Sequence, residues 1–190
     1  MRDLIEIRWH GRGGQGVVTA GKLLAEMALA GDGYFQAFPD YGPERMGAPI
    51  RAFTRLSSRP IHIHSQIDEP DVVVVLDPTL LRTVTVTEGL KEDGILIINT
   101  SASPVVVRES TGFQTGKVFT VDASQIAIEE IGREITNTPM LGAFARATGL
   151  FDVEQIAGQL RAWFGKKIPT GAVEANIRAM RRAAAAVQQG

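Results

Sequence analysis

The spacing of apolar residues changes sharply after the first ten positions of the chain. An apolar run over residues 4–9, interrupted by Glu6 and Arg8, predicts a β-strand that ends at a cluster of glycines. Apolar residues then recur at helical spacing, so residues 15–30 are expected to form a helix with one buried face. With a second strand predicted over residues 34–38, these elements make a βαβ unit of the usual size.

Further strands are predicted in the middle of the chain. Residues 72–76 and 95–98 are continuous aliphatic runs, typical of strands that are buried on both faces of a parallel sheet. Shorter runs at residues 105–107 and 117–121 are weaker strand candidates. Alternating apolar and polar residues also predict a hairpin at one sheet edge, formed by residues 50–56 and 61–64.

The last third of the chain is predicted to be helical. Asp122 and Asp152 are each followed three residues later by a glutamine, which is the spacing of a capping box. Thr138 precedes a proline, which predicts a helix N-terminus there, and residues 171–187 are expected to form an alanine-rich terminal helix. The alternation of strands and helices predicts an α/β fold in one domain over residues 1–190. We expect a mostly parallel twisted sheet with helices on both faces (Rossmann-like), an edge hairpin and C-terminal helices.

Composition narrows the class of protein. Apolar residues make up 44% and charged residues 22% of 190 residues, as in a globular domain. The net charge of −1 argues against a nucleic-acid-binding protein, and the absence of cysteine excludes a cysteine-ligated iron–sulfur cluster in this chain. The N-terminus has no continuous apolar segment, and no run reaches the roughly 20 apolar residues of a membrane span. We therefore expect a cytoplasmic protein.

The glycine cluster carries the clearest candidate chemistry. Gly11, Gly13 and Gly16 match G-x-G-x-x-G after a predicted strand and at the start of a predicted helix. Such glycines let the backbone turn tightly and let an anion approach the N–H groups of the helix N-terminus. Arg12 could contact a phosphate, and Gln15 could bond a carbonyl or hydroxyl group of a ligand. The predicted cofactor-binding residues are Gly11, Arg12, Gly13, Gly14, Gln15 and Gly16.

Two other interpretations of this loop remain open. In a self-contained NAD(P)-binding enzyme, an acidic residue ends the second strand and holds the ribose. Gln36 and Phe38 stand at that place, while Asp32 comes too early and Asp40 lies beyond a proline, which counts against a dinucleotide site. The other alternative is a purely structural subunit, in which the loop is a tight crossover without a ligand.

A second candidate segment follows the predicted second strand. Prolines and glycines exclude regular structure over residues 39–49, yet the segment is rich in aromatic and charged side chains. Tyrosine and arginine are enriched at the centres of protein interfaces. We therefore expect a loop that faces a ligand or partner, carried by Tyr41, Glu44, Arg45 and Arg51.

The remaining polar candidates are predicted to be structural. His62 and His64 would share one strand face, but no third metal ligand stands near them, so a solvated face and no metal site are expected. His10 is expected to be a hydrogen-bonded turn residue, and Asp77, which precedes Pro78, is expected to cap a helix. The sequence contains no Ser-His-Asp set, Walker lysine pattern or activated cysteine, so no catalytic residue is predicted.

Several segments in the same order resemble the γ subunit, or γ-like domain, of 2-oxoacid:ferredoxin oxidoreductases, and most of all the pyruvate type. The first is HGRGGQGVVTA at residues 10–20 and the second is AFPDYGPERMGAPIR at residues 37–51. Further matches lie at residues 77–81, 88–94 and 137–142. The resemblance spans nearly the whole chain and is far more specific than the glycine pattern alone.

The resemblance implies a non-catalytic subunit of a larger enzyme. Such enzymes oxidatively decarboxylate a 2-oxoacid, here expected to be pyruvate, with coenzyme A to an acyl-CoA, carbon dioxide and reduced ferredoxin. Thiamine diphosphate, Mg and iron–sulfur clusters would lie in α, β and ferredoxin-like δ subunits or fusions, and this chain alone would bind none of them. The γ portion is associated with coenzyme A binding and assembly. The glycine loop would then cradle phosphates of coenzyme A, and the loop around Tyr41 would face the active-site subunits.

Overall fold

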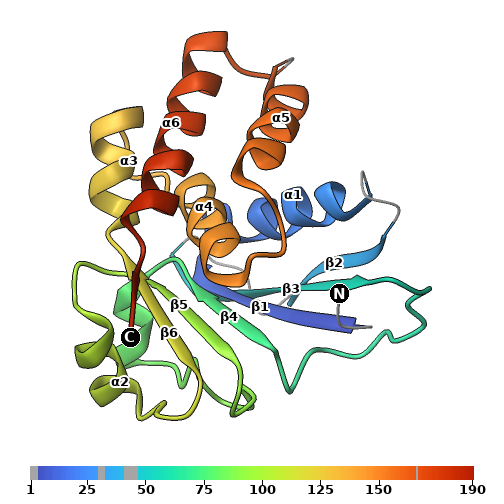
Figure 1. The fold of residues 1–190 in the computed structure, drawn as a ribbon, viewed down its shortest axis with the longest axis vertical. Coiled ribbons are helices and arrows are strands. Elements are labelled where there is room, and N and C mark those ends of the chain that lie inside the picture. The colour runs from blue at the N-terminus through green and yellow to red at the C-terminus, as the bar shows by residue number, and fades with distance from the viewer. Residues whose placement is uncertain (1–3, 30–32, 41–46, 166) are drawn as a thin grey trace.

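One β-sheet with helices packed against it makes up the part of the chain that the structure describes (Figure 1). The computed structural model describes residues 4–29, 33–40, 47–165 and 167–190. The strands are β1 (Leu4–Arg12), β2 (Tyr34–Asp40), β3 (Pro49–Ser57), β4 (Val72–Val75), β5 (Ile95–Asn99), β6 (Lys117–Val121) and β7 (Gln188–Gln189). The helices are α1 (Val17–Leu29), the 3₁₀-helix η1 (Pro78–Arg82), α2 (Pro104–Thr111), α3 (Ala123–Ile131), α4 (Asn137–Thr148), α5 (Val153–Phe164) and α6 (Thr170–Ala186).

The sheet is mixed, with a parallel centre. Its strands lie in the order β2-β3-β1-β4-β5-β6-β7. Parallel pairing joins β1 to β4, β4 to β5 and β5 to β6, whereas β3 is antiparallel to both β1 and β2, and β7 is antiparallel to β6. The predicted α/β fold is therefore confirmed, and the parallel pairing predicted for most of the sheet is confined to its four central strands.

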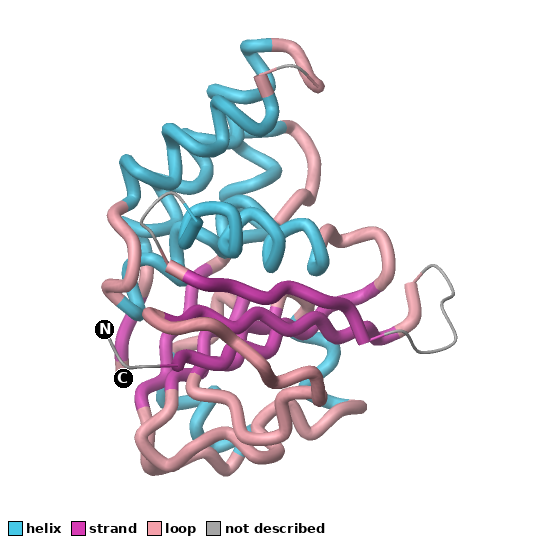
Figure 2. Tube along the Cα trace, turned by 90° about the vertical axis from the view of Figure 1, so that its right-hand side faces the viewer, coloured by secondary structure: helices cyan, strands magenta, loops and turns pink. Residues whose placement is uncertain are grey.

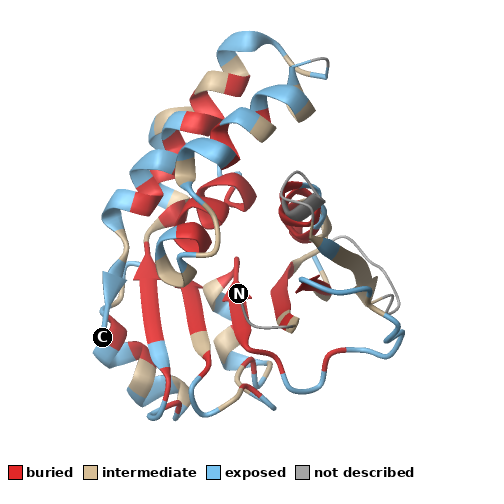
Figure 3. Cartoon of the chain, turned by 45° about the vertical axis from the view of Figure 1, so that its right-hand side comes forward, coloured by how far each residue is buried: buried red, intermediate tan, exposed pale blue. Residues whose placement is uncertain are grey.

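The two faces of the sheet are covered unequally. Helices α1, α3, α4, α5 and α6 lie on one side, while α2, η1 and long loops lie on the other (Figures 1 and 2). The larger apolar core lies on the first side and includes Trp9 and Phe144, whose ring centroids are 5.7 Å apart. A smaller cluster around Val75 and Ile98 fills the second side. The central strands are buried along most of their length, as expected for parallel strands covered on both faces (Figure 3).

The predicted hairpin at residues 50–56 and 61–64 is wrong in its second strand. Strand β3 pairs with β2, and residues 61–64 form no strand, with His62 and His64 exposed. Gln36 Nε2 donates to the carbonyl oxygen of Ile61 at 3.4 Å and Arg55 Nη1 to that of Ile63 at 3.5 Å, so these acceptors bond side chains instead of a neighbouring strand.

The strand predicted at residues 105–107 is also wrong, because these residues lie in α2. The Ser103 hydroxyl accepts a hydrogen bond from the backbone of Val106, and Pro104 stands at the start of the helix. A serine cap followed by proline outweighs the strand preference of three valines. The strand predicted at residues 117–121 is confirmed as β6.

The helix starts in the last third follow the predictions with one exception. Asp152 and Gln155 form a complete capping box, and Asp122 accepts the backbone N–H of Gln125. Helix α4, however, begins at Asn137, so Thr138 lies in its first turn and does not cap it. None of the helices within the described residues combines the length and hydrophobicity of a membrane-spanning segment.

Candidate functional site

The glycine loop lies at the point in the sheet from which the chain connections run to opposite sides. From β1 the chain runs through α1 to β2 on one side, whereas the neighbouring strand β4 leads through η1 to β5 on the other side. In open α/β sheets, ligands bind outside the carboxyl ends of the strands at such a point. The loops that follow β1 and β4 are therefore the expected place for a site.

Asp77 joins these two loops. One carboxylate oxygen accepts Arg12 Nε at 3.1 Å and Gln15 Nε2 at 2.9 Å. The other oxygen accepts the backbone N–H of Thr79 at 2.9 Å and its hydroxyl at 2.6 Å, which caps η1 as predicted. The cap thus also fixes the two polar side chains of the glycine loop.

The loop is also hydrogen-bonded to the two residues that precede β3. Arg12 Nη1 donates to the carbonyl oxygen of Gly47 at 3.0 Å, and the backbone N–H of Gly13 donates to Ala48 at 3.0 Å. Gln15 Oε1 accepts the backbone N–H of Arg12 at 2.7 Å. The loop is therefore held in one conformation by contacts from three parts of the chain.

Backbone donors of the loop remain open for a ligand. Gly14 is exposed and has a φ of 96°, and Gly16 has a φ of 75°, so both occupy conformations that favour glycine. The first α1 backbone bond runs from Ala20 N to Gly16 O, which leaves the N–H groups of residues 17–19 without a helical acceptor. These groups point out of the helix N-terminus and favour an anion.

The start of α4 borders the same loop, and the sequence analysis assigned it no role in the site. The side chain of Asn137 lies against Gly16, and Thr138 beside it is completely buried. The sequence did single out this region, because residues 137–142 form one of the segments that carry the resemblance. The resemblance did not show that the region contacts the glycine loop.

The predicted second segment is only partly within the described residues. Tyr41, Glu44 and Arg45 lie outside them. Arg51 lies on β3, where its guanidinium bonds the carboxylate of Asp40 at 2.8 Å and lies 5.8 Å from the ring centroid of Phe53. Arg51 is thus held at the strand end beside the loop.

Strand β2 offers no unpaired carboxylate that could hold the ribose of a dinucleotide. Asp40 ends this strand, but its carboxylate already bonds Arg51 and accepts Gln66 Nε2 at 2.8 Å. Gln36 bonds the Ile61 carbonyl oxygen at 3.4 Å and accepts Arg55 at 3.3 Å. The ribose-binding acid of an NAD(P) enzyme is therefore missing from the described part of β2.

His10 is a buried strand residue instead of a turn residue. It accepts a hydrogen bond from Arg8 Nε at Nε2, with a distance of 3.0 Å. Arg8 is itself buried and donates to the carbonyl oxygens of Val86 and Glu88. Burial, followed by the positive charges of Arg8 and Arg51, lowers the pKa of His10 to about 3.

We expect His10 to make the chain sensitive to mild acid. The unfolded histidine binds a proton below about pH 6.5 and the folded one only near pH 3, so stability falls as the pH is lowered. Between pH 7 and 5 the wild type should lose about 2 kcal/mol more unfolding free energy than His10→Asn. Urea unfolding at several pH values measures this difference, and equal losses in both proteins would contradict it.

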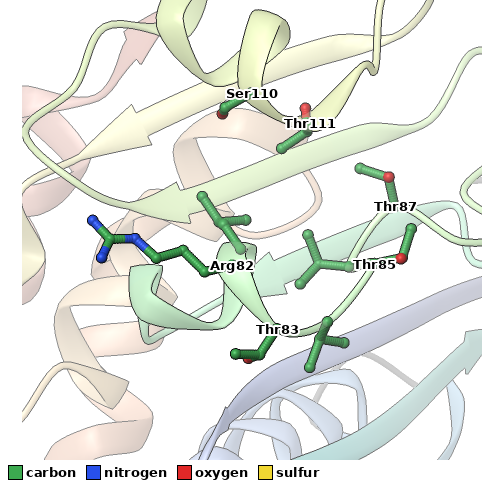
Figure 4. A pocket seen from close by; sticks show the side chains of 9 residues that line it. Arg82, Thr83, Thr85, Thr87, Ser110 and Thr111 are labelled. Carbon is green, nitrogen blue, oxygen red and sulfur yellow. The ribbon is translucent and has the colours of Figure 1, made fainter.

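A pocket of about 310 Å³ lies on the other face of the sheet (Figure 4). Its lining is rich in hydroxyl groups, and the guanidinium of Arg82 extends away from the threonines (Figure 4). No carboxylate or histidine lines it, so it offers no acid–base pair. The described ranges of the chain also hold no group of three or more histidine or acidic residues placed to bind a metal.

Comparison with known proteins identifies the family of this chain. Residues 6–186 match the family model described as pyruvate ferredoxin/flavodoxin oxidoreductase. The chain belongs to this family. The resemblance inferred from the sequence motifs is thereby confirmed.

Relatives in this family are similar over almost their full length. The pyruvate synthase subunit PorC of Thermotoga maritima is 52% identical over 181 residues, which cover 95% of this chain and 93% of that protein. The pyruvate/ketoisovalerate oxidoreductases common subunit gamma of Pyrococcus abyssi is 52% identical over 180 residues, covering 95% of each chain. The crystal structure of the Thermotoga maritima pyruvate oxidoreductase subunit PORC superposes with a TM-score of 0.88 at 46% identity, covering 100% of this chain and 99% of that one.

Proposed function

We propose that this chain is the γ subunit of a 2-oxoacid:ferredoxin oxidoreductase that acts on pyruvate. The observation that carries the proposal is the 52% identity to a pyruvate synthase subunit over 181 residues. The assembled enzyme would convert the 2-oxoacid and coenzyme A to an acyl-CoA and carbon dioxide, with transfer of electrons to ferredoxin. The partners would be the α, β and ferredoxin-like δ subunits of the same complex.

The role of this chain within the complex is non-catalytic in our proposal. The similar Pyrococcus abyssi protein is named as a subunit common to pyruvate and ketoisovalerate oxidoreductases. A subunit shared by two such enzymes is poorly suited to select the 2-oxoacid. Without cysteine, this chain offers no thiolate ligand for an iron–sulfur cluster. Thiamine diphosphate, Mg and the clusters would therefore be held by the partner subunits.

The glycine loop at residues 11–16 is the proposed binding site for a phosphate of coenzyme A. Its backbone is held by Asp77 and by the residues just before β3 before any ligand arrives, so little conformational freedom is lost on binding. Gly14 leaves room for a phosphate near the open backbone N–H groups of α1, because no protein atom lies within 4 Å of the place its Cβ would take. Arg12 would add positive charge from its place beside Asp77, and Gln15 would hold the loop in shape.

The neighbouring segment would contact the subunits that carry the active site. Arg51 lies near the start of β3, at the same end of the sheet as the glycine loop, and 41% of its side chain is exposed. In the sequence, Tyr41, Glu44 and Arg45 stand between β2 and β3. We propose that they take part in assembly.

A Gly14→Ala substitution in the assembled enzyme tests the loop directly. A Cβ at Gly14 would meet no protein atom within 4 Å, so it would occupy only the space left for the ligand. We expect the KM for coenzyme A to rise about tenfold, which corresponds to about 1.4 kcal/mol of binding free energy.

Gly112→Ala is the matched control for this substitution. Gly112 ends α2 with a φ of 70°, and a Cβ there would also meet nothing within 4 Å. Both variants should lose about 1 kcal/mol of stability from the left-handed backbone conformation. Only Gly14→Ala should change the KM for coenzyme A. An unchanged KM and turnover in Gly14→Ala would refute coenzyme A binding at the loop.

A further inference from the structure

Asn137 places an amide against the start of α1. It is the first residue of α4 and is only 7% exposed. Its Oδ1 accepts the backbone N–H of Thr138 at 2.9 Å, which fixes the orientation of the amide. Its Nδ2 is the atom nearest to the position that a Cβ on Gly16 would take, at 2.5 Å. The donor end of Asn137 therefore faces the glycine loop.

This donor has no acceptor among the residues that the structure describes. The hydrogen bonds of Asn137 in that part of the chain use its oxygen and leave Nδ2 unpaired. The neighbouring Thr138 hydroxyl is completely buried and is likewise without a partner. A completely buried hydroxyl without a partner, such as that of Thr138, is rare in native proteins because its lost hydration is not replaced. A ligand atom that accepts hydrogen bonds would remove this cost.

The surroundings select a negatively charged acceptor. Two side-chain acceptors at the site are already used: Gln15 Oε1 accepts the Arg12 backbone N–H, and the Asp77 carboxylate accepts Arg12 and Gln15. The unpaired groups are donors, namely the Asn137 amide and the first N–H groups of α1. Donors that converge at the positive end of a helix dipole suit a phosphate.

We infer that Asn137 is a ligand-binding residue that donates Nδ2 to the phosphate held by the glycine loop. The inference rests on the proposed function, because the phosphate is taken to be that of coenzyme A. It extends the site from the glycine loop to the start of α4, which supplies a side-chain donor in addition to the backbone donors of α1. It also gives Gly16 a second reason to be glycine, because a Cβ there would displace the Asn137 amide.

The test uses Asn137→Asp and Asn137→Ala in the assembled enzyme. Asp keeps the acceptor for Thr138 N–H and the size of the side chain, but it replaces the donor with a negative charge. Calorimetry should give a Kd for coenzyme A that rises more than tenfold in Asn137→Asp and by a smaller factor in Asn137→Ala. The KM for pantetheine, which lacks the phosphates of coenzyme A, should stay unchanged in both variants.

Asn176→Asp is the matched control, because Asn176 on α6 is also 7% exposed and its amide bonds Ala172 O within its own helix. It should leave both constants unchanged. If Gly14→Ala weakens coenzyme A binding while both Asn137 variants bind normally, the role of Asn137 is overturned and the proposed function stands. If none of these variants changes the Kd, coenzyme A binding at the glycine loop is overturned together with the role of Asn137. An equal rise for coenzyme A and pantetheine would also overturn the role, since it would show a general disturbance of the site.

Discussion

Replacing Asp77 by alanine is expected to lower the free energy of unfolding by about 3 kcal/mol and to release the glycine loop. The substitution removes the shared acceptor of Arg12, Gln15 and Thr79 and leaves the Arg12 charge without its carboxylate. Binding of coenzyme A should weaken with it, because the loop would no longer be ordered in advance. Chemical denaturation of the chain and calorimetry of the assembled enzyme measure the two effects.

The effect of Asp77→Ala should also depend on pH. Burial alone would raise the pKa of Asp77, but hydrogen bonds from Thr79 and Gln15 and the charge of Arg12 outweigh it and lower the pKa. A lowered folded pKa contributes stability above the unfolded value of about 3.9, and that stability is lost as the pH falls through the folded value. The difference between wild type and Asp77→Ala should therefore be full at neutral pH and shrink in acid.

Asp122→Ala provides the control for loss of a helix cap. The Asp122 side chain accepts the backbone N–H of Gln125 at the start of α3. Its replacement should cost about 1 kcal/mol, which is typical of a cap, and should leave coenzyme A binding unchanged. Equal losses in Asp77→Ala and Asp122→Ala would mean that Asp77 acts only as a cap for η1 and does not hold the loop.

Gly142→Ala is expected to destabilise the chain by about 3 kcal/mol, through the contact between α4 and α6. A Cβ at Gly142 would lie far inside van der Waals contact with the backbone carbonyl oxygen of Met180 on α6. Because this obstacle is backbone, the two helices must move apart. Movement of α4 would also shift Asn137 away from Gly16, so coenzyme A binding should weaken together with stability.

Gly158→Ala is the control for Gly142→Ala and is expected to raise the stability of the chain instead of lowering it. Gly158 lies within α5, and a Cβ there would meet nothing within 4 Å. Alanine should stabilise this helix by about 0.5–1 kcal/mol, because glycine loses more backbone freedom on folding. A neutral or stabilising Gly142→Ala would contradict the close approach of α4 and α6. Thermal unfolding of both variants gives the answer.

The first βαβ unit could be predicted because its signals are local. The strand, the glycine turn and the helix over residues 17–29 each depend on neighbours in the sequence. The hairpin partner of β3 could not be predicted in the same way. Residues 61–64 alternate as a strand would, but in the folded chain the carbonyl oxygens of Ile61 and Ile63 accept hydrogen bonds from the side chains of Gln36 and Arg55.

The glycine loop was located from the sequence, but the residues that shape it were not. Asp77 bonds Arg12 and Gln15 across 65 and 62 positions of the chain, and Asn137 meets Gly16 only in the folded protein. Asp77 was correctly predicted as a cap, since that role depends on the adjacent Pro78. Its second role depends on the parallel pairing of β1 and β4, which no local pattern encodes.

The most direct measurement is a structure of the assembled enzyme with coenzyme A bound. We predict a coenzyme A phosphate within hydrogen-bonding distance of the backbone N–H groups at Gly14 and the start of α1, with Asn137 Nδ2 as a further donor. Coenzyme A bound wholly by the partner subunits, with no contact to residues 11–16, would contradict this account and leave the loop as a structural crossover.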